Sequence, residues 1–396
     1  MPGKVGMVSL GCSKNAINSE QMLGLLKEAG YELTAELAEV DTLIINTCAF
    51  IESAKMEAIE NILEFAALKE EGRLKKIIVT GCLSQRYKEE ILKELPEVDG
   101  LVGCGSFNEI VKALTMAENG EVPLLFGDID APVDETERVV SSPEGWAYIK
   151  IAEGCDNHCA YCVIPSIRGR YRSRPMENIL EEARKLADGG VKELILIAQD
   201  ITRYGTDLYG RRRLSELVKE LAKIEGIKWI RLHYLYPDMI DDELIDTIKN
   251  EEKVVKYLDI PIQHINDKVL KLMNRRGSGA EIRALFKRLR SEMPGLVIRT
   301  SLITGLPGEG EAEFEELSAF LQEAKLERAG VFTFSPEEGT PAAGMERADV
   351  ETAQHRCDLL VSLQSRIMDE FNQSRLGSII EVMAEDYDRL AEYWYG

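Results

Sequence analysis

The sequence lacks any apolar run approaching the ~18 residues that a membrane-spanning helix requires. Its first residues lead into a short strand-like segment and not into a secretion signal, so we expect a cytoplasmic protein without membrane contact. An excess of cations is also lacking, because 48 Lys and Arg face 69 Asp and Glu, for a net charge of −21. A surface of this kind is not built throughout to attract phosphate backbones, and any contact with nucleic acid would have to be local.

A disulfide framework is not expected either, although the chain has eight cysteines, because a large cytoplasmic protein stays reduced. Several cysteines follow apolar runs, which suggests ligands or catalytic groups; the alternative for any single one is a small buried hydrophobic residue. The chain of 396 residues exceeds the size at which one core usually keeps growing. We therefore expect two or more domains.

Residues 1–125 are predicted to form an open parallel α/β sheet domain. Short apolar runs predict strands at residues 4–10, 43–47, 76–80 and 100–103. The helical stretches between them, at residues 15–29, 52–70 and 84–94, are long enough to cover the faces of the sheet. Residues 126–145 lose the apolar periodicity and gather acidic residues and prolines, which is typical of a linker.

A second strand–helix series occupies residues 146–376. Its strands are predicted at residues 147–152, 193–198, 228–234, 255–261, 296–303 and 330–334. Six such units predict an open or partial (β/α)6 barrel, followed by a long helix at residues 350–374. Residues 377–396, with a β-like run at 378–384, would make at most the beginning of a truncated β domain, because closing a barrel needs several strands.

Cys155, Cys159 and Cys162, named here the loop cysteines, lie on one short loop after a predicted strand. Zinc sites favour paired cysteines and four protein ligands, whereas iron–sulfur clusters are held by thiolates from closely spaced loops. Three thiolates on a four-iron cluster leave one iron open to chelation by S-adenosylmethionine (SAM), and one electron can then cleave SAM to a deoxyadenosyl radical. The spacing predicts such a 4Fe–4S cluster, against a zinc site or three unligated cysteines.

Cys12, Cys48 and Cys82, named here the strand-end cysteines, each come directly after an apolar strand. Because parallel strands share their carboxyl edge, we expect the three thiols to converge there and to hold a second three-thiolate cluster. Cys104 also follows a short strand and could be a fourth ligand, which would close the cluster and make it an electron carrier. Cys357, alone on a predicted helix, is expected in the core.

The spacing of the loop cysteines after the first strand of an α/β barrel resembles the radical SAM superfamily. That resemblance implies SAM contacts at residues 189–193 and 303–309, where glycines permit close backbone approach. The alternative is that these glycines mark turns and that polar residues at strand ends cap loops. The candidate cofactor contacts are Tyr161, Gly190, Gln199, Gln263, Ile303 and Gly305.

Two open clusters in this order resemble the methylthiotransferases over essentially the whole chain. Matching segments are residues 11–15 (GCSKN), 18–20 (NSE), 46–48 (NTC), 81–82 (GC) with 85–86 (QR), and 153–155 (EGC) with Pro165 and 168–169 (RG). The resemblance implies two 4Fe–4S clusters and SAM, with the strand-end cluster holding the sulfur. It also implies that the radical removes a substrate hydrogen, that the carbon then takes sulfur, and that a second SAM supplies the methyl group.

Residues 164–169 (IPSIRG), 199–202 (QDIT) with 204–205 (YG), and 232–237 (LHYLYP) look like the branch that modifies an aspartate of small-subunit ribosomal protein twelve at its β-carbon. The implied product is 3-methylthioaspartate. The implied partners are that protein, on the ribosome, together with an electron donor and a sulfur donor. The acidic charge balance agrees better with a protein substrate than with naked RNA. The alternatives are a transfer-RNA adenosine methylthiotransferase and, outside enzymes, an iron–sulfur electron carrier.

Arginines recur at every second residue after the loop cysteines, at positions 168, 170, 172 and 174. An extended backbone would place all four on one face. They could steer an acidic target or the cofactor carboxylate. The alternative is a solvated basic edge that protects a strand.

Overall fold

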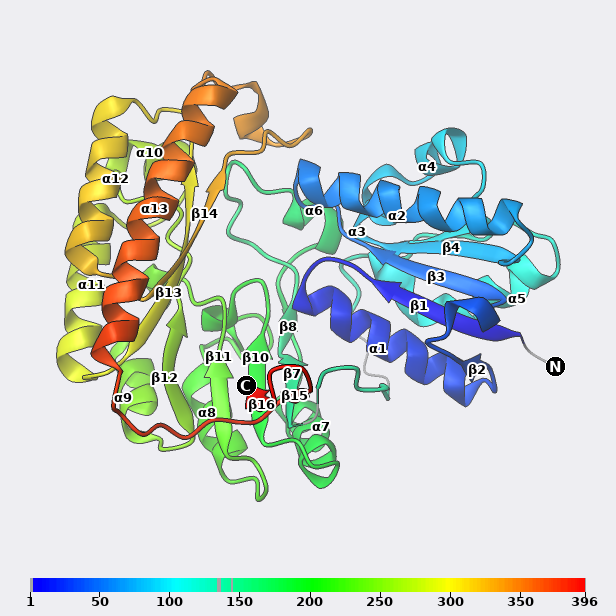
Figure 1. Cartoon of the computed structure of the whole chain (residues 1–396), viewed down its shortest axis with the longest axis horizontal. Coiled ribbons are helices and arrows are strands. Elements are labelled where there is room, and N and C mark those ends of the chain that lie inside the picture. The colour runs from blue at the N-terminus through cyan, green and yellow to red at the C-terminus, as the bar shows by residue number, and fades with distance from the viewer. Residues whose placement is uncertain (1–2, 134–136, 144, 396) are drawn as a thin grey trace. The chain divides into compact units, whose positions relative to one another are not determined.

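The structure is a computed structural model that describes residues 3–133, 137–143 and 145–395 (Figure 1). Residues 134–136 and 144 of the predicted linker, like residues 1, 2 and 396, lie outside the described residues. The chain divides into two compact units. The first unit extends to residue 141 and includes the segments 153–156 and 162–174, and the second contains residues 142–152, 157–161 and 175–396. No helix among the described residues is both long and apolar enough to cross a lipid bilayer.

The first unit is built on a six-stranded parallel sheet with the order β2-β1-β3-β4-β5-β6. Its strands are β1 (Lys4–Ser9), β2 (Glu32–Leu33), β3 (Thr42–Thr47), β4 (Lys76–Gly81), β5 (Gly100–Val102) and β6 (Leu124–Leu125). The four longer strands match the predicted ones, which confirms the parallel sheet. The edge strands β2 and β6 were not predicted, because two residues carry too little periodicity to be recognised.

Helices cover both faces of this sheet (Figure 1). On one face lie α1 (Ser13–Glu28) and α5 (Ile110–Glu118), and on the other lie α2 (Glu52–Glu70) and α4 (Glu90–Glu94). Because successive strand residues point to opposite faces, Ile44 packs with α1 and α5, whereas Leu43 and Ile45 pack with α2. The one helix predicted at residues 84–94 is two, α3 (Cys82–Tyr87) and α4, since Lys88 adopts a left-handed φ of 48°.

Short elements complete the first unit. They are the 3-10 turns η1 (Leu37–Glu39) and η2 (Cys104–Glu109), the helix α6 (Ile164–Arg168) and the strand β9 (Arg172–Ser173), which forms a small two-stranded sheet with β8 (Ala152–Glu153). Val163 and Ile167 anchor the α6 segment, because both are buried in the core beneath α2.

The first unit continues past residue 125, the predicted end of the domain. Residues 137–141, named here the strap, lie against α1. The Glu20 carboxylate pairs with Arg138 and accepts hydrogen bonds of 2.8 Å from the backbone N–H and the hydroxyl of Ser141. Gly24 makes room on α1, because a Cβ atom there would lie 2.2 Å from the carbonyl oxygen of Glu137. These contacts extend the compact unit into the predicted linker.

The second unit is built on a parallel sheet whose six strands lie in sequence order, β7-β10-β11-β12-β13-β14 (Figure 1). They are β7 (Trp146–Lys150), β10 (Glu193–Ile197), β11 (Trp229–Leu232), β12 (Val254–Asp259), β13 (Val297–Thr304) and β14 (Arg328–Thr333). All six coincide with predicted strands, as expected of a partial (β/α)6 barrel. The strands are joined by α7 (Met176–Asp188), η3 (Ile201–Arg203), α8 (Leu214–Ala222), η4 (Pro237–Met239), α9 (Asp242–Asn250), α10 (Asp267–Leu272), α11 (Gly279–Glu292) and α12 (Glu311–Ala324).

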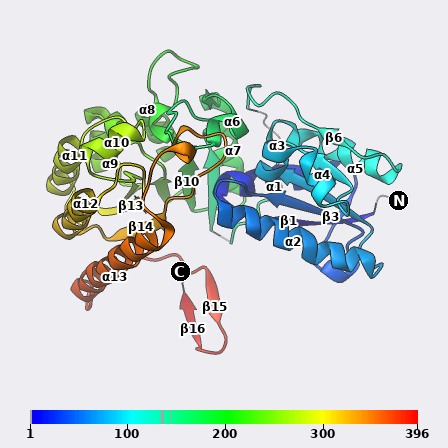
Figure 2. The ribbon, with the colours of Figure 1, turned by 90° about the horizontal axis from the view of Figure 1, so that it is seen from above.

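After β14 come η5 (Pro341–Gly344) and α13 (Val350–Ser374), which matches the predicted helix and packs on β13 and β14. The chain then forms an antiparallel hairpin of β15 (Asp386–Asp388) and β16 (Tyr393–Tyr395) (Figure 2). The strand predicted at residues 378–384 is not formed, and this prediction was wrong. The apolar side chains of Ile379 and Ile380 are exposed and pair with no neighbouring strand among the described residues, and a strand needs such a partner.

Candidate functional site

The strand register brings the strand-end cysteines to the carboxyl edge of the first sheet. Thr47 pairs with Gly81 in the parallel ladder, so Cys48 and Cys82 follow β3 and β4 at the same level. β1 pairs with β3 in the same direction and ends shortly before Cys12. Cys12 directly precedes α1, and Cys82 is the first residue of α3. Both thiols therefore lie at the amino end of a helix, which is the end that carries the positive pole of the helix dipole.

Gly11 lets the turn before α1 approach Cys48. Its φ is 91°, and a Cβ atom at this position would lie 2.7 Å from Cβ and 3.1 Å from Sγ of Cys48. A larger residue would therefore displace Cys48. Asn15 fixes the same turn, because its Nδ2 donates to the carbonyl oxygens of Leu10 at 2.9 Å and Thr47 at 2.8 Å. The carboxyl ends of β1 and β3 are thus tied together beside two thiols.

Cys82 is a buried thiol with Cys104 and Arg168 as neighbours. Its Sγ lies 3.7 Å from Nη2 of Arg168. The hydrogen bond with Cys104 and the charge of Arg168 lower the pKa of Cys82 to about 6, although burial opposes this shift. Burial raises the pKa of Cys48 to about 11, and the hydrogen bond with Cys82 raises the pKa of Cys104 well above its usual value. Of these three thiols, Cys82 most readily forms the thiolate that binds metal.

Arg168 is a buried cation, with 3% of its surface exposed. Its Nη1 donates to both carboxylate oxygens of Glu153, at 3.1 and 3.2 Å, and its Nη2 donates to Oδ1 of Asn15 at 2.6 Å. The prediction of four arginines on one extended face was wrong, because Arg168 ends the helix α6 and the strand β9 is only two residues long. A solvated edge is also excluded for Arg168 and for the buried Arg174.

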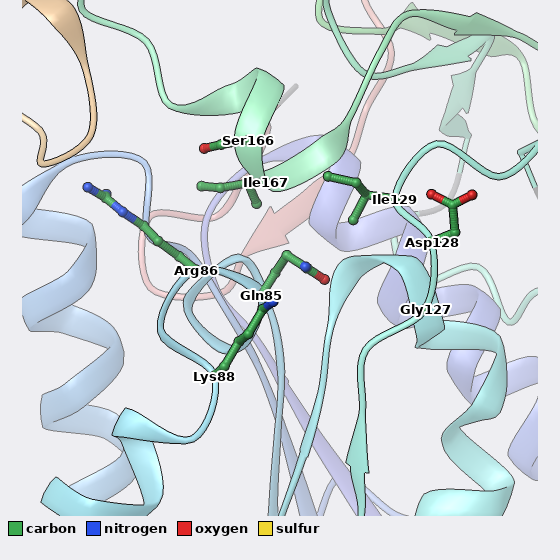
Figure 3. A pocket seen from close by; sticks show the side chains of 8 residues that line it. All are labelled: Gln85, Arg86, Lys88, Gly127, Asp128, Ile129, Ser166 and Ile167. Carbon is green, nitrogen blue, oxygen red and sulfur yellow. The ribbon is translucent and has the colours of Figure 1, made fainter.

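A pocket of about 450 Å³ lies beside α3 in the first unit (Figure 3). It is lined by Gln85, Arg86, Lys88, Gly127, Asp128, Ile129, Ser166 and Ile167. Within the described residues, the buried Oε1 of Gln85 has no hydrogen-bond partner. The charged, amide and hydroxyl groups suit a small polar ligand. No single motif predicts this pocket, because its three lining segments are far apart in sequence.

The loop cysteines divide between the two units by packing. Cys155 and Cys162 are partly buried and belong to the first unit, where the backbone N–H of Cys155 donates to the carbonyl oxygen of Gly169 at 3.1 Å. Cys159 belongs to the second unit and is buried. Its Sγ lies 2.7 Å from the hydroxyl oxygen of Tyr236 and 3.7 Å from Nη1 of Arg275.

Five of the six candidate cofactor contacts lie at the carboxyl edge of the second sheet. Gln199 follows β10, Gln263 follows β12, and Ile303 lies near the end of β13, where its N–H donates to the carbonyl oxygen of Gln263 at 2.8 Å. Tyr161 follows Cys159 on the cysteine loop and contacts Arg275 through its hydroxyl at 3.2 Å. These positions keep the predicted SAM contacts together.

Two of the predicted glycines have structural explanations. Gly305 follows β13, and a Cβ atom there would lie 2.5 Å from Cβ of Ala353 on α13, so helix packing alone requires glycine. Gly190 lies after α7 and before β10, with φ of 99°. This is the opposite edge of the sheet, separated from the carboxyl edge by the length of β10, about 16 Å. The prediction that Gly190 contacts SAM was therefore wrong, because it forms a turn at the amino edge.

The donor set fits thiolate-bound clusters. Among the described residues, no three His, Cys, Asp or Glu side chains meet at the spacing of a single metal ion. Thiolate sulfur is the ligand that holds iron–sulfur clusters. Gly11 keeps the Cys12 turn close to Cys48, and Arg168 supplies a buried positive charge beside Cys82.

Sequence reasoning missed several residues of these sites. Tyr236 and Arg275 contact Cys159 from positions 77 and 116 residues further along the chain, and no motif links such distant positions. Glu153 carries a local signal, because it directly precedes the Gly154-Cys155 pair, but its pairing with Arg168 is visible only in the fold. Cys357 is buried on α13, which confirms its predicted place in the core.

Comparison with known proteins decides the family. The Radical SAM superfamily matches residues 149–321, and the Uncharacterized protein family UPF0004 matches residues 4–103. The ribosomal protein uS12 methylthiotransferase RimO of Acetivibrio thermocellus is 49% identical over 405 residues, covering 100% of this chain and 89% of that protein. RimO of Geobacter sulfurreducens is 50% identical and covers 98% and 88%. The chain belongs to the uS12 methylthiotransferase family.

Membership in this family confirms the resemblance that the sequence motifs indicated. A RimO protein of a Thermoanaerobacter species is also 50% identical, with 97% of this chain and 88% of that protein covered. Among solved structures, the radical SAM methyltransferase TsrM of Kitasatospora setae matches with a TM-score of 0.65 and 15% identity, over 87% of this chain and 77% of that chain. At that identity the match supports the fold alone.

Proposed function

We propose that this chain inserts sulfur at the β-carbon of an aspartate of ribosomal protein uS12 and methylates it, with the strand-end cysteines and the loop cysteines each holding a 4Fe–4S cluster. The chain is a SAM-dependent transferase of the uS12 methylthiotransferase family, and its relatives of about half-identical sequence are named for that activity. The observation that supports the two-cluster assignment is the row of thiols at the carboxyl edge of the first sheet. The alternative of an iron–sulfur electron carrier is less favoured, because electron transfer alone would not need the second, barrel-like unit that contains Cys159.

When bound, the clusters and SAM supply the electron, the radical and the sulfur for this reaction. The residues of the chain bind and orient these groups. In the first unit Asn15 and Gly11 set the turn of Cys12 against Cys48, and Arg168 balances the charge of the Cys82 thiolate. In the second unit the candidate SAM contacts are Tyr161, Gln199, Gln263, Ile303 and Gly305, all at the carboxyl edge of the sheet.

The proposed partners follow from the substrate. A ribosomal protein places the reaction in the cytoplasm, with uS12 presented on the ribosome, and an external electron donor and a sulfur donor complete the reaction. The net charge of −21 supports a protein substrate over naked RNA, since an acidic surface repels a phosphate backbone. The names of the relatives favour uS12 over the transfer-RNA alternative.

The test is methylthio transfer by the reconstituted, anaerobic enzyme. The enzyme is incubated with SAM, a reductant, sulfide and either small ribosomal subunits or transfer RNA, and each product is examined by mass spectrometry. We expect a methylthio group on an aspartate of uS12 and none on the RNA. A variant with Cys48→Ala should lose this product, whereas Cys357→Ala, a buried cysteine on α13, should keep it. Modification of RNA alone would overturn the proposal.

A further inference from the structure

Residues 273–276, directly after α10, run alongside the part of the cysteine loop that belongs to the second unit. The Nδ2 of Asn274 donates to the carbonyl oxygen of His158 at 2.9 Å. The backbone N–H of Ala160 donates to the carbonyl oxygen of Met273, also at 2.9 Å. His158 and Asn274 both have positive φ, 49° and 51°, so neither segment could lie this way as regular helix or strand. The two segments therefore fix each other.

Arg275 is the member of this segment that reaches a sulfur. Its Nη1 lies 3.7 Å from Sγ of Cys159, 2.7 Å from the hydroxyl oxygen of Tyr236 and 3.2 Å from that of Tyr161. Its Nη2 donates to the carbonyl oxygen of Pro261 at 2.5 Å. The planar guanidinium is thus held on both sides and aims one nitrogen at Cys159.

Arg275 carries a positive charge although the residue is buried, with 8% of its surface exposed. A buried cation is costly unless an anion lies beside it. In the part of the chain that the structure describes, no carboxylate contacts Arg275: its partners are two phenol hydroxyls, a backbone carbonyl and the sulfur of Cys159. A cysteine that ligates iron is a thiolate, so Cys159 is the partner that becomes negatively charged when metal binds.

We propose that Arg275 is a positioning residue that holds Cys159 for the cluster of the loop cysteines and, as the counter-charge of its thiolate, raises the reduction potential of that cluster. The proposal rests on the cluster assignment made under the proposed function. A positive charge close to a thiolate ligand stabilises the reduced cluster, which carries one more electron than the oxidised form. The electron comes from the external reductant, and no bond of the protein changes.

The test uses the full chain with the three strand-end cysteines replaced by alanine, so that one cluster gives the signal. Potential is measured by redox titration followed by electron paramagnetic resonance, and iron retention is measured against a chelator. Arg275→Met should shift the midpoint to a more negative potential and weaken iron retention by roughly 10- to 100-fold. Arg275→Lys should stay near the parent potential, because it keeps the charge while losing the planar contacts.

Arg276→Met is the matched control. Arg276 contacts the Asn157 side chain and lies 3.3 Å from a carboxylate oxygen of Asp238, but among the described residues it contacts no thiol. We expect weaker iron retention from this variant without a shift of potential. The proposal would be overturned if the cluster of Arg275→Met kept the reduction potential of the parent protein. It would also be overturned if the potential of Arg275→Lys shifted as far as that expected for Arg275→Met. If Arg275→Met takes up no iron, the reduction potential of Arg275→Lys alone tests the proposal. If the parent protein itself takes up no iron, the cluster assignment fails instead.

Discussion

Gly11→Ala tests whether the close approach of the Cys12 turn to Cys48 builds the first-unit site. The added Cβ would lie 2.7 Å from Cβ and 3.1 Å from Sγ of Cys48, so the thiol must move. The left-handed backbone, with φ of 91°, adds about 1–2 kcal/mol of strain. Gly30→Ala is the matched control, because Gly30 has nearly the same φ, 87°, yet its Cβ would meet no atom within 4 Å.

Gly30→Ala should therefore lose about 1–2 kcal/mol of stability, measured by denaturant unfolding of the metal-free protein, and Gly11→Ala should lose more, because its Cβ also displaces Cys48. Only Gly11→Ala should also lose the cluster of the strand-end cysteines. Iron analysis of reconstituted protein should give about eight atoms per chain for the wild type and Gly30→Ala, and about four for Gly11→Ala.

The reaction products of the variants should change in parallel with their iron content. Gly11→Ala should keep deoxyadenosine formation, which we assign to the loop cysteines, and should lose methylthio transfer, since even a 1 Å displacement of a reacting group can cost about 100-fold in rate. Equal iron content in the two alanine variants would refute the reasoning, because the contact with Cys48 would then have no consequence for metal binding.

Three further changes test other parts of the first unit. Arg168→Met should destabilise the metal-free protein by about 3–5 kcal/mol in denaturant unfolding, because the Glu153 carboxylate loses its buried cation. Adding Glu153→Gln should recover much of this loss. A double variant as unstable as Arg168→Met would contradict the ion-pair explanation. Replacing all three strand-end cysteines by alanine should preserve deoxyadenosine formation and abolish the methylthio product, and loss of both would show that the two clusters do not divide the reaction in this way. Glu20→Gln should loosen the strap by removing the charge that pairs with Arg138, seen as faster hydrogen exchange at residues 137–141 with unchanged iron content.

The long strands of both sheets could be predicted because each contains a cluster of apolar residues. The pattern is clearest in β3 and β10, where every residue is buried. The break between α3 and α4 could not be predicted in the same way. It depends on Lys88 taking a left-handed conformation, and lysine carries no local preference for that conformation. The run at residues 378–384 misled for the opposite reason, since an apolar pattern forms a strand only where a neighbouring strand pairs with it.

The cysteines of the candidate site were predictable because their place after a strand follows from topology alone. The surrounding charges were not. The arginines at every second position from Arg168 to Arg174 indicated an extended strand with one basic face. In the structure Arg168 instead ends a short helix, and its side chain is buried. Arg275 lies 116 residues beyond Cys159, so only the folded chain brings the two together. Gly190 was misplaced because a glycine pair signals a turn without saying at which edge of the sheet the turn lies.

Arg168 and Arg275, the buried arginines that lie beside a cysteine sulfur, differ in how their charge is balanced, and this difference bears on the chemistry. Arg168 shares its charge between the Glu153 carboxylate and the sulfur of Cys82, so a carboxylate already offsets part of the positive charge that faces Cys82. Arg275 has no carboxylate among its described contacts, so its charge acts on Cys159 with little compensation. A site that must accept an electron benefits from an uncompensated positive charge, whereas a site that holds sulfur for transfer does not require one. The charges beside Cys159 and Cys82 therefore agree with the proposed reduction at the loop cysteines and the proposed sulfur transfer at the strand-end cysteines.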